Sequence, residues 1–330
     1  MTPAHPSRRS ALAAASAAVA LAAVPAARAQ DFPGRSIRFV VGYAPGGPTD
    51  VIARLVAADV QAALGQSVIV ENKAGANGNI ATEEVARAAP DGHTLIVNTL
   101  SHNVNYLLAQ GRVKYEPSRD FAPVSLAVVL PLVLVVGGQS PHASVGDLLK
   151  AAKANPGAIS YGSAGHGGSA HLAAALLEQR GGVRMNHVPF RGNAPALTEV
   201  MAGRVDFMFY PMIGVAERVA QKQLRALGVT TQKPHPDYPG VPTMADAGFP
   251  GFEDYVGPVG FLAPAGTPEA ALAKLSGAIR ASLAKPATQE RLRGLGAVVV
   301  GSSPAEYRAW LKGDHDRWAQ LIKDAGVKAE

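Results

Sequence analysis

Short β-rich runs alternate with alanine-rich helical stretches along nearly the whole chain. Strands are predicted at 36–41, 67–71 and 94–98, and the segments that follow the first two, from about 51 and about 80, repeat apolar residues at helical spacing. Each strand runs into a turn or loop before the next element. This alternation is typical of βα units arranged around largely parallel sheets.

A proline divides the most apolar β-rich run of the chain. Residues 124–136 are mostly β-formers, interrupted by Pro131. A run of this length broken by proline suits strands that cross between domains better than a membrane helix. The βα pattern then restarts, so a second domain is predicted to begin close to residue 128, with strands near 159–161, 185–188 and 224–229.

Capping signals mark several helices of the second half. Ser144 with Asp147 and Ser303 with Glu306 have the spacing of a capping box, and Gly181-Gly182 stops a helix that starts near residue 169. A long irregular stretch rich in Pro and Gly, 231–257, precedes another strand. The remainder is predicted to be strongly helical.

The first 29 residues are predicted to be an export signal. Arg8 and Arg9 precede an uncharged run at 11–27, and Ala27-Arg28-Ala29 has the small-x-small pattern of a signal peptidase site. The run is too short and too rich in alanine to span a membrane. We therefore expect a mature, periplasmic chain that begins at Gln30, exported by the general secretory or the twin-arginine route.

Composition excludes several functional classes. Removing the signal takes Arg8, Arg9 and Arg28 and no acid, so the formal charge falls from +6 to +3, and no basic cluster of nucleic-acid type is present. A hydrophobic fraction of 48% with 17% charged residues predicts a well-filled core and excludes a disordered or collagen-like chain. The absence of cysteine excludes thiol catalysis, iron–sulfur clusters and cysteine-rich zinc sites.

Four turns that follow strands are built largely from Gly, Ser, Thr and Asn, at 42–50, 74–79, 98–103 and 161–169. In an open α/β sheet such turns lie at the carboxyl edge of the strands, where helix N-termini direct unpaired N–H groups and partial positive charge outwards. A site of this kind prefers an anion, which glycine allows close to the backbone. The alternative is that the glycines only permit tight turns, but the recurrence of four such turns favours a binding site.

Other chemistries find little support in the motifs. No Gly-Lys-Ser/Thr follows a glycine-rich turn, so a P-loop is absent. Residues 165–170 fit a loose dinucleotide fingerprint, but the next strand lacks the acid that a ribose needs. Tyr161-Gly162-Ser163-Ala164-Gly165 lacks the first Gly of a nucleophile elbow, which makes Ser163 a weak nucleophile candidate.

The histidine and carboxylate spacings are equally uninformative. His166, His171 and His187 match no usual zinc pattern, so capping or core roles are favoured, and we expect no metal and no cofactor. Nothing in the sequence supports Asp50 and Asp206 as a glycosidase pair. Arg191 follows a strand and could face a carboxylate, although an exposed arginine is the favoured interpretation.

A series of longer motifs runs in order through the mature chain. They are Phe-Pro-Gly-Arg-Ser-Ile at 32–37, Pro-Gly-Gly-Pro-Thr-Asp at 45–50, Glu-Asn-Lys-Ala-Gly-Ala-Asn-Gly at 71–78, Ala-Pro-Asp-Gly-His-Thr-Leu at 89–95, Tyr-Gly-Ser-Ala-Gly at 161–165, His-Val-Pro-Phe-Arg-Gly at 187–192, Val-Pro-Thr-Met-Ala-Asp-Ala-Gly at 241–248 and Ala-Pro-Ala-Gly-Thr-Pro at 263–268. Together they resemble the Bug-type periplasmic receptors, the TctC-like solute-binding proteins of tripartite tricarboxylate transporters. Single pieces would not be specific, but the joint pattern is.

The resemblance implies an α/β type II periplasmic-binding-protein fold, in which two βα lobes joined by two crossing segments close on an organic acid. Lobe one is expected at 30–127 plus 257–330, and lobe two at 128–256. Backbone amides, hydroxyls and waters, rather than arginine clamps, are expected to hold the carboxylate. The residues expected to bind the ligand are Tyr43, Ala44, Gly46, Gly47, Thr49, Asp50, Asn77, Ser101, Ser163, Ala164, Gly165, His166, Arg191 and Tyr210.

Departures from the family pattern leave the acid unnamed. Tyr210-Pro211 stands where relatives often have an Asp, and Pro258-Val259 stands where a Trp is common. Asp50 is the odd member of the expected set, because a carboxylate repels an anion; binding water, capping the helix or meeting an amino group all stay open.

Two functions are therefore weighed. The favoured one is a monomeric receptor that captures a di- or tricarboxylate, an amino acid or an aromatic acid for uptake or sensing, with transporter membrane subunits or a sensor as partner and no nucleic acid. The alternative is an exported hydrolase or other enzyme that uses Ser163 on the same scaffold.

Overall fold

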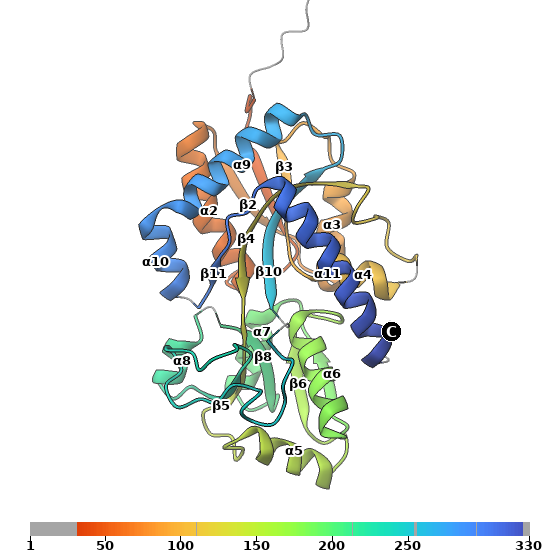
Figure 1. Cartoon of the computed structure of the whole chain (residues 1–330), viewed down its shortest axis with the longest axis vertical. Coiled ribbons are helices and arrows are strands. Elements are labelled where there is room, and N and C mark those ends of the chain that lie inside the picture. The colour runs from red at the N-terminus through yellow and green to blue at the C-terminus, as the bar shows by residue number, and fades with distance from the viewer. Residues whose placement is uncertain (1–31, 110, 213, 254–255, 295, 326–330) are drawn as a thin grey trace, which may run out of the picture.

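The chain forms two lobes, each built on one sheet with helices packed against it (Figure 1). The computed structural model describes residues 32–109, 111–212, 214–253, 256–294 and 296–325. The predicted signal peptide, 1–29, lies outside these residues. None of the helices described is long and apolar enough to cross a membrane. The α/β class predicted from the sequence is confirmed.

The first lobe is built from two separate parts of the chain. Its N-terminal part contains β1 (Ile37–Val41), α2 (Pro48–Leu64), β2 (Val68–Asn72), the single-turn helix η1 (Ala76–Gly78), α3 (Asn79–Ala86), β3 (Thr94–Asn98), α4 (Ser101–Ala109) and β4 (Phe121–Leu130). Its C-terminal part contains β10 (Gly257–Pro264), α9 (Glu269–Ala284), α10 (Pro286–Gly294), β11 (Val298–Val299) and α11 (Pro304–Ala325). The sheet order is β11-β4-β10-β3-β1-β2.

The second lobe is built from one continuous stretch. It contains β5 (Leu132–Gly137), α5 (Val145–Ala154), β6 (Ser160–Ser163), α6 (Ser169–Gly181), β7 (Asn186–Pro189), α7 (Asn193–Met201), β8 (Phe207–Pro211), α8 (Ala216–Ala220) and β9 (Leu224–Val229). The sheet order is β7-β6-β8-β5-β9. Strands β1, β2 and β3 are parallel in one sheet, and β6, β7 and β8 are parallel in the other. The turns after parallel strands therefore gather at one edge of each sheet.

The chain passes from the first sheet to the second at Pro131. Strand β4 still pairs with β10 at Leu130, opposite Gly257, and β5 begins at Leu132 in the other sheet. The boundary predicted at 127/128 therefore falls inside β4, because the residues up to Leu130 complete the first sheet. The division of the chain into lobes at given residues stays a prediction.

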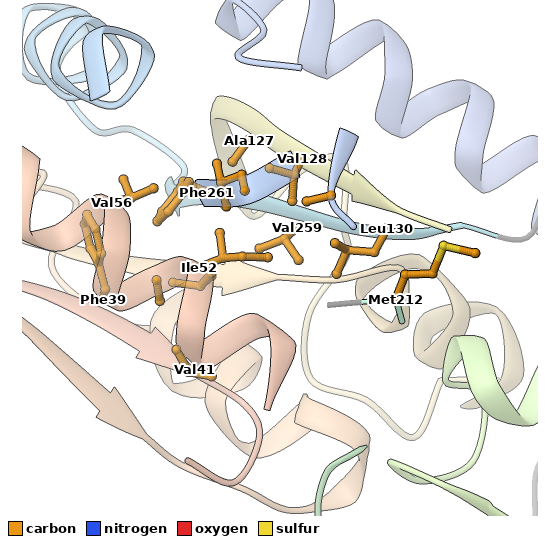
Figure 2. Close-up of a cluster of buried hydrophobic side chains, with 14 of the residues drawn as sticks. Phe39, Val41, Ile52, Val56, Ala127, Val128, Leu130, Met212, Val259 and Phe261 are labelled. Atoms are coloured by element: carbon orange, nitrogen blue, oxygen red, sulfur yellow. The ribbon is translucent and has the colours of Figure 1, made fainter. Parts of the chain in front are cut away.

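A continuous apolar cluster joins the lobes along these crossing strands (Figure 2). Phe39 of β1 and Phe261 of β10 pack with ring centroids 5.0 Å apart. Met212, directly after β8, belongs to the same cluster as Leu130. The floor between the lobes is therefore made of packed side chains, which fixes the strand ends around the site.

Strand β10 requires glycine at residue 260. A Cβ there would lie 2.1 Å from the hydroxyl oxygen of Tyr307, which is buried in α11 and donates a 2.7 Å hydrogen bond to Asn98 at the end of β3. Val259, the residue before this glycine, lines the space between the lobes. Helix α11 thus packs against the sheet at close range, and its C-terminal half contacts α6 of the second lobe.

Candidate functional site

A small cavity lies between the two lobes, at the ends of strands from both sheets. Its volume is about 30 Å³. Lobe one and the crossing segments contribute Tyr43, Gly47, Pro48, Thr49, Thr99, Leu100, Leu130, Gly257, Pro258 and Val259, and lobe two contributes Ala164, Gly168, Ser169, Asn193 and Pro211. None of these described lining residues is charged.

Three helices begin at this cavity, and none of them has a side-chain cap. Gly47, Gly168 and Gly192 are the N-cap residues of α2, α6 and α7, and no side chain accepts from the first amides of these helices. The first turn of a helix leaves backbone N–H groups unpaired, and its dipole places partial positive charge there. Glycine caps leave this positive surface open, so the cavity is suited to an anion without any cationic side chain.

Two hydroxyls add donors to the same surface. Thr49 and Ser169, in the first turns of α2 and α6, line the cavity, and within the described residues neither hydroxyl makes a hydrogen bond. A Cβ on Gly47 would lie 4.0 Å from the amide nitrogen of Ala194, which shows how closely the starts of α2 and α7 approach each other across the lobes. The two lobes therefore complete one site.

Asp50 does not line the cavity; it stabilises the turn 43–50 through hydrogen bonds. Its carboxylate accepts hydrogen bonds from the Gly46 amide and the Asn72 side chain, both at 2.9 Å, and pairs with Arg54. Burial alone would raise the pKa of this carboxyl, but the hydrogen bonds from Arg54, Gly46 and Asn72 outweigh it and hold the pKa below its ordinary value. Asp50 is thus a charged, paired anchor for the turn 43–50.

A cluster of hydroxyls lies beside the cavity. The Tyr43 hydroxyl is 2.6 Å from Ser101 Oγ and 2.9 Å from Thr99 Oγ1, which are themselves 2.8 Å apart. Burial raises the pKa of Tyr43, although its bonds to Ser101 and Thr99 oppose this effect. Tyr43 is therefore neutral and held in one position. Ser101 does not line the cavity but positions Tyr43, which does.

Ser163 is fully buried, and its contacts are those of a structural residue. Its hydroxyl accepts from the Gly165 amide at 3.0 Å, and its Oγ lies 2.6 Å from His187 Nε2. The other ring nitrogen, Nδ1 of His187, has no hydrogen-bond partner within the described residues, so no carboxylate orients this pair as in a catalytic triad. Burial, together with the nearby His171 and His166, lowers the pKa of His187 to about 3.

Three histidines that are far apart in sequence meet in lobe two. His166, His171 and His187 each offer a ring nitrogen within 4.8 Å of the others. The rings of His171 and His187 stack, with centroids 4.2 Å apart and planes 17° from parallel, and Tyr161 stacks on His187. Nδ1 of His171 accepts a 2.9 Å bond from the Gly167 amide, so the neutral ring carries its proton on Nε2.

This geometry favours a stack of neutral rings over a metal centre. Parallel rings direct their in-plane lone pairs past one another, and a neutral His171 has its remaining lone pair occupied by Gly167. Burial, with the nearby His166, lowers the pKa of His171 to about 4, which keeps the ring uncharged at neutral pH. That the three residues meet could not be predicted from the sequence, because their spacing matches no ligand motif.

A larger groove opens on one side of the cavity, between the same lobes. Its volume is about 810 Å³, and Asn77, Gly165, His166 and Arg191 line it together with Ala164, which also lines the small cavity. Hydrogen bonds cross the groove's margin: the Asn77 side-chain amide donates to the His166 carbonyl, and the Ala44 amide donates to the Arg191 carbonyl at 3.1 Å. The lobes are closed on each other in this conformation.

The fourteen residues expected to bind the ligand thus occupy different places. Tyr43, Gly47, Thr49 and Ala164 line the small cavity, and Asn77, Gly165, His166 and Arg191 line the groove. Ala44, Gly46, Asp50, Ser101 and Ser163 lie next to these residues but line neither space. Tyr210 is buried in β8 and lines neither space, whereas its neighbour Pro211 lines the cavity. Which of them touch a ligand stays a prediction.

Several lining residues outside the expected set come from turns that follow strands or begin helices. Gly168, Ser169 and Asn193 begin helices α6 and α7, so they belong to the type of turn from which an anion site was predicted. Thr99 and Leu100 follow β3 in the same way. Pro211 and Gly257–Val259 come from the end of β8 and the start of β10, where no comparable turn signal exists.

Proteins of known sequence resemble this chain along almost its whole length. A protein encoded in the tcbD–tcbE intergenic region of Pseudomonas sp. (strain P51) is 41% identical over 98% of this chain and 96% of its own length. Protein BugT of Bordetella pertussis is 33% identical over 91% of this chain and 92% of its own length.

Solved structures agree with the fold described above. The periplasmic binding protein BugD superposes with a TM-score of 0.86, at 35% identity, covering 91% of this chain and all of its own. MatC from Rhodopseudomonas palustris, with bound malate, gives 0.84 at 33% identity, covering 88% of this chain and 100% of its own. An R. palustris protein with adipate gives 0.85 at 33% identity, covering 90% and 99%.

These similarities confirm the family resemblance seen in the motifs, and they bring with them the two-lobed periplasmic-binding-protein fold. The similar proteins are binding and transport receptors rather than enzymes, so the alternative of a hydrolase using Ser163 finds no support. The model of the tripartite tricarboxylate transporter family receptor matches residues 52–327. This chain belongs to that receptor family.

Proposed function

We propose that the protein captures a small organic carboxylate between its lobes in the periplasm and delivers it for uptake or sensing without altering it. The observation that carries the proposal is the meeting of three helix N-termini, all with uncapped glycine starts, at one uncharged cavity. Such a surface provides N–H donors and a positive potential without the free-energy cost of burying a cationic side chain. The malate and adipate bound by two structural relatives are the chemistry that this surface fits.

The proposal includes opening and closing of the lobes. A cavity of about 30 Å³ has room for little more than a carboxylate group, since one water alone needs roughly 10–15 Å³. A whole dicarboxylate therefore enters only when the lobes separate, and the interlobe bonds of Asn77 and Ala44 then re-form around it. The bound ligand thereby stabilises the closed conformation relative to the open one.

The partners and location are proposed on the same basis. A receptor of this family would present the closed complex to the membrane subunits of a tripartite tricarboxylate transporter or to a sensor. A signal peptide at 1–29 would take the chain to the periplasm, where we propose that it acts as a monomer without a cofactor.

A valine at residue 47 tests the site. Its side chain would extend into the cavity, where Gly47 leaves the first amides of α2 open. With the mature, ligand-free protein, we expect calorimetric titration with malate, adipate and other carboxylates to give binding that Gly47→Val abolishes. Gly277→Val is the matched control, because Gly277 lies exposed in α9 with no atom within 4 Å of an added Cβ.

The result decides the proposal in both directions. Binding lost in Gly47→Val and kept in Gly277→Val, with the acid recovered unchanged, supports it. Unchanged affinity in a folded Gly47→Val protein refutes the site. A chemically altered acid refutes the receptor function.

A further inference from the structure

One residue that lines the cavity carries a buried polar atom that an anion cannot satisfy. Oδ1 of Asn193 is buried and has no hydrogen-bond partner within the described residues. Asn193 is the first residue of α7 and lines the cavity beside the starts of α2 and α6. A buried acceptor without a donor costs free energy, so a ligand that supplies the donor is favoured over one that does not.

The other polar groups around the cavity have the opposite character. Thr49 and Ser169 offer hydroxyl donors, and the helix starts offer backbone N–H groups. The hydroxyls of Tyr43 and Thr99 are already bonded to each other. Asn193 Oδ1 is therefore an acceptor set among donors, a combination that recognises a carboxylate with a donor next to it.

The position of the acceptor limits where on the ligand the donor sits. Asn193 is the first residue of a helix whose first amides are proposed to bind the carboxylate, so a ligand group that donates to Oδ1 must lie close to that carboxylate. The small cavity has the same effect, since it leaves no room for a long spacer. A substituent on the carbon next to the carboxylate satisfies both conditions.

Resting on the function proposed above, we infer that the preferred ligand is a 2-hydroxy or 2-amino acid, and that Asn193 Oδ1 accepts a hydrogen bond from its hydroxyl or ammonium group. Unsubstituted acids fill the same carboxylate position but leave Oδ1 without a partner. Asn193 is then the residue that discriminates between these two classes.

Three four-carbon diacids provide a matched test. Malate has a hydroxyl, aspartate an ammonium and succinate only hydrogen on the carbon in question. We expect the ligand-free mature protein to bind malate or aspartate about tenfold or more tightly than succinate, as calorimetry would measure. Whichever of the two binds better identifies the hydroxyl or the ammonium as the donor.

Variants at residue 193 separate the acceptor from general packing. Asn193→Leu keeps the size but removes the acceptor, and should bring all three acids to nearly the affinity of succinate. Asn193→Asp keeps an acceptor and should retain a preference for a substituted acid, although its charge weakens binding of every anion. Asn186→Leu, an exposed change on β7 of the same lobe, is the control and should behave as the unchanged protein. Circular dichroism confirms folding of each variant.

The outcomes distinguish this inference from the proposed function. Succinate bound as tightly as the better of the other two acids overturns the inference alone, as does binding of adipate without any of the three. An equal loss for all three acids in Asn193→Leu also overturns it, because the amide would then be donating to the shared carboxylate. If no acid binds the unchanged protein, the inference and the proposed function both fail.

Discussion

Asp50 holds the first turn of the site in place, and its removal should weaken both the fold and ligand binding. The carboxylate is 3% exposed and accepts from the Gly46 amide, from Asn72 and from Arg54. Hydrogen bonds to a charged group each contribute roughly 1.5–3 kcal/mol. The Arg54 side chain is 52% exposed, so its ion pair adds about 1 kcal/mol or less.

These values give a loss of roughly 3 to 7 kcal/mol in the free energy of unfolding for Asp50→Ala at neutral pH, with the hydrogen bonds from Gly46 and Asn72 contributing most. The effect on binding is smaller. If the change frees about one residue of the turn 43–50, the ligand must re-order it at roughly 1–2 kcal/mol, which raises Kd about tenfold. The reason is indirect, because Asp50 itself does not line the cavity.

Asp59→Ala is the matched control. Asp59 accepts from Ser282, Thr288 and Lys285 in the same lobe, away from the cavity. Thermal unfolding and calorimetric titration of both variants should show that each loses stability while only Asp50→Ala loses affinity. A folded Asp50→Ala protein with unchanged affinity would refute the reasoning, and so would an equal loss of affinity in Asp59→Ala.

Three further predictions follow from buried contacts. Gly260→Ala should destabilise the fold by several kcal/mol, because its Cβ would overlap the Tyr307 hydroxyl. Denaturant unfolding measures this loss, and a loss of less than about 1 kcal/mol would contradict the prediction. Folding lowers the pKa of His171 to about 4 and of His187 to about 3, so the unfolded chain binds more protons than the folded chain below about pH 6.5. The free energy of unfolding should therefore be full above that pH and fall as the pH drops towards 3. His187→Gln should flatten the slope of melting temperature against pH. Asn77→Gly keeps the left-handed backbone but removes the hydrogen bond to the His166 carbonyl in the other lobe. X-ray scattering of the ligand-free variant should therefore give a larger radius of gyration. An unchanged radius of gyration would show that this hydrogen bond does not hold the lobes closed.

The sequence predicts secondary structure well where the periodicity is strong. The predicted strands 94–98 and 224–229 coincide with β3 and β9, and the capping box of Ser303 and Glu306 is formed in the structure. Helix α2 begins earlier than its apolar pattern, at Pro48, because proline fits the first helical turn and glycine precedes it. An apolar period cannot reveal a first turn made of Pro, Thr and Asp.

The site was predictable only in part. Glycine-rich turns after strands indicate where helix N-termini will lie, which is how the turns at 42–50 and 161–169 were singled out. They do not indicate which turns meet across the lobes, so Asn193, at the start of α7, was not among the expected residues. For Asp50 the expectation went too far. Its position in the glycine-rich turn suggested contact with a ligand, but its carboxylate bonds to Gly46 and Asn72 instead.

The central claim is that negative charge on the ligand is what the helix starts bind. The most direct measurement is the melting temperature of the ligand-free mature protein with each carboxylic acid and with the neutral amide of the same acid. A ligand at 100 times its Kd should add roughly 2.7 kcal/mol, which is several degrees. We predict stabilisation by at least one acid and none by its amide. Equal stabilisation by an acid and its amide would contradict the claim.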